Sequence, residues 1–258
     1  MTYFHRVSET RFQPTAHVSG AWNTAEQHIA PALGLLTHLI EKDRDRRRDD
    51  DLRLARVSAE ILGVLTLDEV EVALRVLRPG RTIELVEAEL TQHGRTAVIL
   101  RAWLLQRQDT ASLAGVALEP MPALAAVPHD DFDTRWPGGF VRTVEARRLF
   151  LATGRSQCWI RPRASLLEDE EVSPMARMLG IIDIANGLSP RALPGEVAFP
   201  NVDFTASFFR DAGDGWVGLD IRASFGPDGT GLTDSVVHDE RGPIGTLTQT
   251  LTLRPLSV

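Results

Sequence analysis

The sequence predicts an α+β fold made of two tandem copies of one unit, each with a sheet of antiparallel strands and one hydrophobic helix. The two halves begin with similar stretches, FHRVSETRFQPTAHVSGAW at 4–22 and FVRTVEARRLFLATGRSQCW at 140–159. In each half an almost wholly apolar segment follows, and strand-like segments with turn residues come after it. This shared order of elements indicates an internal duplication.

The apolar segments at 29–41 and 174–188 predict one central helix in each half. In IAPALGLLTHLIE the apolar residues cover most of the helix circumference, whereas a surface helix has an apolar stripe and a polar back. Such a helix has to be surrounded by other elements. A curved antiparallel sheet wrapped around one helix, the hot-dog arrangement, surrounds it, so two copies predict a double hot-dog with the sheets side by side.

Antiparallel strands are expected after each helix. Segments rich in β-branched and aromatic residues follow in both halves, such as TIELVEAELTQHGRTAVILRAWLL in the first and GTGLTDSVVHDERGPIGTLTQTLTLR in the second. Gly94 and Gly242 lie at corresponding places in these two segments and predict equivalent hairpin turns. Gly34 and Gly180 likewise correspond within the two apolar segments.

The predicted boundaries are an N-terminal repeat at 1–107, a linker at 108–139 and a C-terminal repeat at 140–258. The linker is rich in alanine, proline and acidic residues without a clear period, which is typical of a surface segment. The run EKDRDRRRDDD at 41–51 alternates in sign too densely to be buried. We therefore expect a solvated loop after the first helix.

Composition narrows the function classes. The chain has 258 residues, a net charge of −7 and scattered arginines, which argues against nucleic acid or an anionic membrane as a partner. It has neither a signal-peptide core at its start nor an apolar run long enough to span a membrane, so we expect a cytoplasmic protein. The single cysteine and the histidines without ligand spacing predict no metal site. The sequence contains neither a complete G-x-S-x-G motif of serine hydrolases nor a complete phosphate-binding loop motif.

The motifs RVLRPGRTIELVEAEL…GR and NVDFT…FFR…WVGLDIRASFGPDGTGL…D…GPIGTLTQTLTLR, in this order, resemble the type II acyl-CoA thioesterase and thioesterase-like family. The resemblance covers nearly the whole chain. It implies a double hot-dog enzyme of bacterial lipid metabolism that hydrolyses acyl-CoA thioesters to free acid and CoA with a directly activated water. It implies no cofactor.

The resemblance also implies an aspartate, a glutamine and a hydroxyl residue in the second repeat that direct the water. The aspartate falls on Asp203, with Arg210 seven positions later, and the glutamine falls on Gln249. The hydroxyl residue falls on or near Ser224. The first repeat has Ser58 in the place of the aspartate, so one site per chain is implied.

These residue types suit thioester hydrolysis, which needs a positioned water, a base and donors for the developing oxyanion. Asp203 is the expected base, while Gln249 and Ser224 can hold the water because each donates and accepts. Backbone N–H groups of SGAWNT at 19–24, just before the first helix, are candidate oxyanion donors. This segment departs from the glycine-rich turn that the family has there.

Strand parity gives an independent view of two of these residues. In GTLTQTLTL, Gln249 shares a face with three leucines, which predicts a buried amide that must be hydrogen-bonded, whether for structure or for catalysis. Asp203 shares a face with hydroxyl residues, and alternation alone places it toward solvent. Only the resemblance favours it as the base.

Asp183, in the apolar segment GIIDIANG, is the second candidate acid, because single-repeat hot-dog enzymes often use an acid on the helix. The alternative is that Asp183 caps the helix or pairs with an arginine. Trp22, Asn23 and Asn201 are the predicted substrate-binding residues; Trp22 as core and Asn201 as a turn residue are the alternatives.

The expected substrate is an acyl-CoA or acyl-carrier thioester. A homodimer through the outer faces of the sheets is expected by analogy. The competing function is a non-catalytic acyl-thioester-binding or scaffold protein that kept the double hot-dog fold.

Overall fold

The computed structural model describes residues 1–256, and a single 13-stranded sheet runs through both halves of the chain. The first half contributes six strands: β1 (Thr2–Arg6), β2 (Arg11–Pro14), β3 (Leu52–Ile61), β4 (Val70–Arg78), β5 (Ile83–Gln92) and β6 (Arg95–Gln106). The second half contributes six equivalent strands: β7 (Val144–Ala152), β8 (Arg155–Pro162), β11 (Asp203–Phe208), β12 (Val217–Phe225), β13 (Thr230–Asp239) and β14 (Gly242–Thr252).

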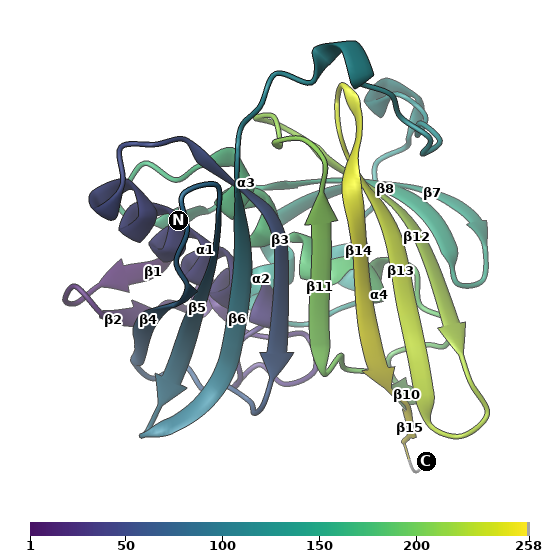
Figure 1. Ribbon diagram of the computed structural model, residues 1–258. Helices are drawn as coiled ribbons and strands as arrows, with labels where there is room; N and C mark the ends of the chain where they lie inside the picture. Colours follow the sequence, from purple (N-terminus) through teal and green to yellow (C-terminus); the bar gives the residue numbers. More distant parts are fainter. Residues whose placement is uncertain (257–258) are drawn as a thin grey trace.

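The two halves have the same strand order. From the seam outward, the first half runs β3-β6-β5-β4-β2-β1 and the second runs β11-β14-β13-β12-β8-β7, so the duplication predicted from the sequence is confirmed. The antiparallel pair β11 and β3 joins the halves side by side (Figure 1). A short strand of the second half, β9 (Ser165–Leu167), pairs with β1 in parallel and ties the far edge of the first half to the second. The fold is a double hot-dog.

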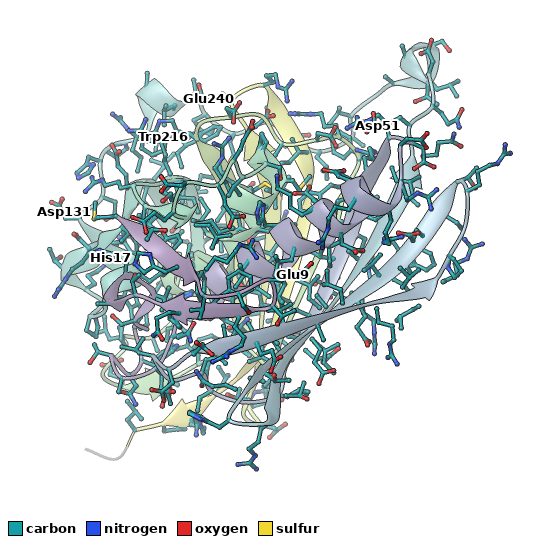
Figure 2. All side chains as sticks on the ribbon, turned by 90° about the vertical axis from the view of Figure 1, so that its left-hand side faces the viewer. Glu9, His17, Asp51, Asp131, Trp216 and Glu240 are labelled. Atoms are coloured by element: carbon teal, nitrogen blue, oxygen red, sulfur yellow. The ribbon has the colours of Figure 1, made fainter. Side chains whose placement is uncertain are left out.

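The central helix of the first half is α1 (Ile29–Arg47), and every residue from 30 to 40 is buried. The sheet curves around it (Figure 2). The helix includes residues 41–47, so the prediction of a solvated loop over the whole run 41–51 is wrong for its first part. Arg47 bonds to Asp43 one turn earlier (2.6 Å) and to buried Glu84 of β5 (2.7 Å), and the basic residues of this last turn suit the negative end of the helix dipole.

The second central segment is not one helix, as predicted, but a broken one. It consists of α3 (Pro174–Leu179), the 3-10 turn η5 (Ile182–Ile184) and α4 (Ala185–Leu188). Glycines and β-branched isoleucines, which are weak helix formers, dominate residues 180–187 and account for the break. The break matters for function because η5 carries Asp183.

The helices of the two halves touch at their equivalent glycines. A Cβ atom built on Gly34 lies 2.7 Å from the Cα of Gly180 and 3.0 Å from the carbonyl oxygen of Ala176. Since backbone atoms stand in its way, α1 and α3 can approach this closely only without a side chain at position 34.

Gly34→Val is therefore expected to lower the free energy of unfolding by about 3 kcal/mol, because the new side chain forces two packed helices apart. Chemical denaturation measures the change. Gly115→Val is the matched control, since nothing lies within 4 Å of a Cβ built there. Equal stabilities of the two variants would contradict this account of the helix contact.

The hairpin glycines have the conformation expected of turns, with φ of 71° at Gly94 and 121° at Gly242. Between the halves, the chain forms three 3-10 turns, η2 (Ala111–Leu113), η3 (Leu124–Ala126) and η4 (Phe132–Thr134). Part of this segment packs Val127 against Trp159 and Trp216 on the outer face of the second half, and the Trp159 indole donates to the Pro122 carbonyl (3.0 Å).

The remaining elements are small: η1 (Ala16–Val18), α2 (Gly139–Arg142), and a separate two-stranded sheet of β10 (Val197–Ala198) and β15 (Arg254–Pro255). No helix within residues 1–256 has the length and apolar character to cross a membrane.

Candidate active site

A cavity of about 290 Å³ lies beside the start of α1. Its wall combines the segment before α1, the loop after β3, the end of the broken second helix and the residues before β11. Trp22, Asn23 and Asn201, the predicted substrate-binding residues, all line it, and so does Asp183. Most of the remaining wall is apolar, with side chains such as Ile61 and Leu65.

Asp183 is the buried centre of this site, with 2% of its surface exposed. Its Oδ1 accepts hydrogen bonds from Asn201 Nδ2 (2.8 Å) and Gln249 Nε2 (2.9 Å). Gln249 Nε2 also donates to the Asp183 backbone carbonyl (2.9 Å), which fixes the amide against η5. Because both amides converge on Oδ1, the other carboxylate oxygen, Oδ2, is free to accept a proton.

Burial dominates the acidity of Asp183. It raises the pKa of this carboxyl to about 7, since a charge is poorly solvated here, while the hydrogen bonds from Asn201 and Gln249 act in the lowering direction. The charge of Asp203 adds a smaller raising effect. A carboxyl that titrates near neutral pH is well matched to accept a proton from water.

His28, the residue before α1, lies close to the same carboxylate but does not neutralise it. Burial lowers the pKa of His28 to about 3, so the ring is neutral near pH 7. Its Nδ1 accepts a hydrogen bond from the Ala30 N–H (3.2 Å), so this nitrogen has no proton to give to Asp183 Oδ2 at 3.9 Å. The ring packs on Phe140 with a centroid distance of 4.1 Å.

The start of α1 leaves one backbone donor beside the cavity. The first four N–H groups of a helix have no partner within the helix. Here the His28 N–H donates to the Val18 carbonyl, the Ala30 N–H donates to the His28 ring, and Pro31 has no N–H. The Ile29 N–H has no partner among residues 1–256, and Ile29 lines the cavity.

Neither the Asp203 carboxylate nor Ser224 bonds to Gln249, although the sequence predicts a shared site; Asp203 adjoins the site only through its backbone carbonyl, which accepts from Asn201 Nδ2 (2.9 Å), and through its charge. The Asp203 carboxylate accepts the backbone N–H of Thr250 (2.5 Å) at the exposed face of β14, and no hydrogen bond joins it to the Gln249 side chain. Ser224 is exposed on β12 and pairs with Leu232, which in turn pairs with Thr250. Since paired residues share a face, Ser224 lies on the side of the sheet opposite to Gln249.

Gln249 bonds to Asp183, whereas the sequence predicted that Gln249 would share a site with Asp203. Asn201, expected only to contact substrate, is a direct partner of the acid as well. The described residues contain no group of three His, Cys, Asp or Glu side chains arranged to hold a metal ion.

The two halves of the chain match the models of two known protein domains. Residues 18–105 match the model of the acyl-CoA thioesterase N-terminal domain, and residues 117–253 match that of the acyl-CoA thioesterase C-terminal domain. The chain belongs to the acyl-CoA thioesterase family. The family resemblance found in the sequence is thereby confirmed.

Solved structures support the fold of this acyl-CoA thioesterase-family chain. A putative thioesterase from Novosphingobium aromaticivorans is 16% identical with a TM-score of 0.73, and the alignment covers 98% of this chain and 99% of that one. An acyl-CoA thioesterase II from Mycobacterium marinum is 15% identical with a TM-score of 0.68, covering 98% and 95%. A protein with a hot-dog fold from Alicyclobacillus acidocaldarius is 15% identical with a TM-score of 0.74, covering 98% and 96%. Comparison with curated proteins gave no match.

Proposed function

We propose that this protein hydrolyses acyl-CoA thioesters to a free acid and CoA, with Asp183 as the general base. The observation that carries the proposal is the convergence of Asn201 and Gln249 on one oxygen of a buried aspartate at a cavity wall. Membership of the acyl-CoA thioesterase family supports the reaction class. Asp203, our expected base from the sequence, gives way to Asp183 because its carboxylate is bonded to the outer face of β14.

In the proposed first step, a water in the cavity attacks the thioester carbonyl carbon. Asp183 Oδ2 takes the proton of this water, while Oδ1 stays bonded to the two amides. The two fixed donors hold the carboxylate in one orientation, so the base does not have to reorganise during proton transfer.

The tetrahedral intermediate then needs a donor for its oxyanion. The Ile29 N–H suits this role, because it is unpaired, lines the cavity and lies at the positive end of the α1 dipole. When the C–S bond breaks, the proton held by Asp183 goes to the leaving CoA thiolate. Asp183 is thereby ionised again, and neither step of the reaction needs a cofactor.

Trp22 and Asn23 are proposed to contact the thioester substrate, since both line the cavity and Trp22 exposes 40% of its surface. Trp22 also packs edge-on against Trp136 and Phe199, which holds its ring at the wall. Coenzyme A is the proposed carrier, and an acyl-carrier protein is the alternative. The homodimer and the cytoplasmic location expected from the sequence stay predictions.

The proposal is tested with a panel of acyl-CoAs of different chain length and detection of the released thiol. We expect hydrolysis whose kcat/KM rises with pH through a midpoint near 7, because only the ionised form of Asp183 accepts a proton and burial raises the pKa of this carboxyl to about 7. Binding of acyl-CoA without any hydrolysis would instead support the non-catalytic acyl-thioester-binding protein.

A further inference from the structure

The connection after β3 is apolar, although connections at a protein surface are usually polar. Residues 61–65 read ILGVL, and they lead from the end of β3 toward β4. Leu65 is buried, but Leu62 and Val64 expose 58% and 70% of their surfaces. Apolar surface in water has an unfavourable hydration free energy, which contact with an apolar ligand removes.

Both exposed side chains line the cavity that contains Asp183. Trp22 lines it as well, from the segment before α1, and exposes 40% of its surface. Single exposed apolar side chains are ordinary on a protein surface. Three of them at one cavity that also contains the proposed base indicate a binding surface for an apolar group.

Hydrogen bonds fix the apolar segment at both ends. The Leu62 N–H donates to the Ala97 carbonyl of β6 (2.8 Å), and the Leu65 carbonyl accepts from the Gln27 N–H (2.7 Å). Gln27 lies two residues before Ile29, the proposed oxyanion donor. The segment is therefore held against the stretch of chain that would bind the thioester carbonyl, so a ligand does not have to order it first.

The cavity is small for a long acyl chain. Its volume of about 290 Å³ lies at the lower end of the range for ligand sites, about 300–1,000 Å³. The thioester group, the attacking water and the adjoining part of the pantetheine arm take up part of this space. A decanoyl chain therefore has to extend past the cavity onto its rim.

The charges of the cavity wall favour an uncharged acyl group. Asp183 and Glu26 are the two acids of this wall, and the described lining residues include no lysine or arginine. An acyl group that ends in a carboxylate would meet like charge there and find no cation as a partner. A hydrocarbon chain meets no such penalty.

We propose that Leu62 and Val64 bind the acyl chain of the substrate where it leaves the cavity, and that they thereby determine the preference for chain length. This inference rests on the proposed function, because it narrows the substrates of the same site to uncharged medium- and long-chain acyl-CoAs. The chain lies on an open surface and is covered on one side. A fully buried methylene favours binding by about fourfold, so a half-covered one is worth about twofold.

The test compares the hydrolysis of butyryl-, hexanoyl-, octanoyl- and decanoyl-CoA by the wild type and four variants. Leu62→Ser and Val64→Ser remove apolar surface from the rim. Leu113→Ser and Val116→Ser are the matched controls, because they make the same changes at linker side chains that are 82% and 57% exposed and do not line the cavity.

In the wild type we expect kcat/KM to rise about twofold for each methylene that reaches the rim. In Leu62→Ser and in Val64→Ser we expect the ratio of kcat/KM for decanoyl-CoA to that for butyryl-CoA to fall about fourfold, which corresponds to the contacts of two half-covered methylenes. The change should appear mainly in KM, since the rim lies away from the reacting atoms. The two controls are expected to keep the wild-type ratio.

A second measurement does not depend on hydrolysis. S-decyl-CoA and S-butyl-CoA are thioethers, which have no carbonyl group for water to attack, and calorimetry gives their dissociation constants. We expect the wild type to bind S-decyl-CoA more tightly than S-butyl-CoA. In Leu62→Ser and Val64→Ser this difference should shrink by about fourfold, as in the kinetic ratio.

The outcomes separate the two proposals. A wild type that hydrolyses none of the acyl-CoAs refutes the proposed function, and the thioether affinities then decide the role of Leu62 and Val64 alone. Equal affinities of the wild type for the two thioethers overturn the binding of the acyl chain by this segment. Variants that bind both thioethers more weakly by the same factor overturn it as well, since the segment would then contact the pantetheine arm. A wild-type difference that both variants retain also overturns it, and contact with another macromolecule would then account for the exposed side chains.

Discussion

Asp183→Asn is expected to lower kcat/KM for acyl-CoA hydrolysis by about 10² to 10⁴-fold, the usual loss when a general base is removed. The asparagine side chain keeps an oxygen that accepts from Asn201 and Gln249, so the cavity wall retains its hydrogen bonds. It has no capacity to take a proton from water. The substitution therefore removes the proton acceptor and keeps the hydrogen bonds of the cavity wall.

Asp203→Asn is the matched control for this prediction. It makes the same change two residues beyond Asn201, at a carboxylate that accepts only the Thr250 N–H at the outer face of the sheet. An asparagine oxygen can accept that bond as well, so we expect activity within about threefold of the wild type, the scale of a surface substitution. The reverse pattern, with Asp203→Asn inactive and Asp183→Asn active, would restore Asp203 as the base.

Strand alternation predicted the faces of the sheet correctly, including the face of Asp203. In the leucine row that contains Gln249, Leu247 and Leu251 are buried and Leu253 is partly buried, and Gln249 itself is buried. Asp203 lies on the face that alternation assigned to it, with its carboxylate bonded to the exposed side of β14. Matching a short motif by its order along the chain carries no information on which face a side chain takes, whereas alternation does.

The pairing of Gln249 with Asp183 was harder to predict, because it depends on where the second helix breaks. The sequence shows weak helix formers between Gly180 and Gly187, but not the turn that directs Asp183 at the sheet. One signal was available in the sequence. A buried amide and an acid in an apolar helix each need a polar partner, and in one core they are natural partners for each other.

The contact of Asn201 with Asp183 has no signal of its own in the sequence. It depends on the path of the chain after Pro200, where Asn201 pairs with Leu251 in an isolated bridge before β11 begins. Tertiary packing positions this residue, and neither periodicity nor spacing predicts it.

Asp183→Asn is also expected to stabilise the protein above pH 7. Burial raises the pKa of Asp183 from near 4 in the unfolded chain to about 7 in the folded protein, so the folded state holds this proton more tightly. The free energy of unfolding of the wild type therefore falls as pH rises from about 4 to about 7, and the penalty is complete above that range. A difference of about three pH units corresponds to roughly 4 kcal/mol.

Asparagine resembles the protonated acid at every pH, so the variant escapes this penalty. We expect equal stabilities of variant and wild type near pH 4 and a gain for the variant of up to about 4 kcal/mol at pH 8, measured by urea denaturation across this range. Asp228→Asn, at an exposed turn, controls for the loss of one carboxyl from the surface. A stability difference between Asp183→Asn and wild type that does not change with pH would mean that Asp183 titrates alike in both states, and the acidity on which the proposed base depends would be absent.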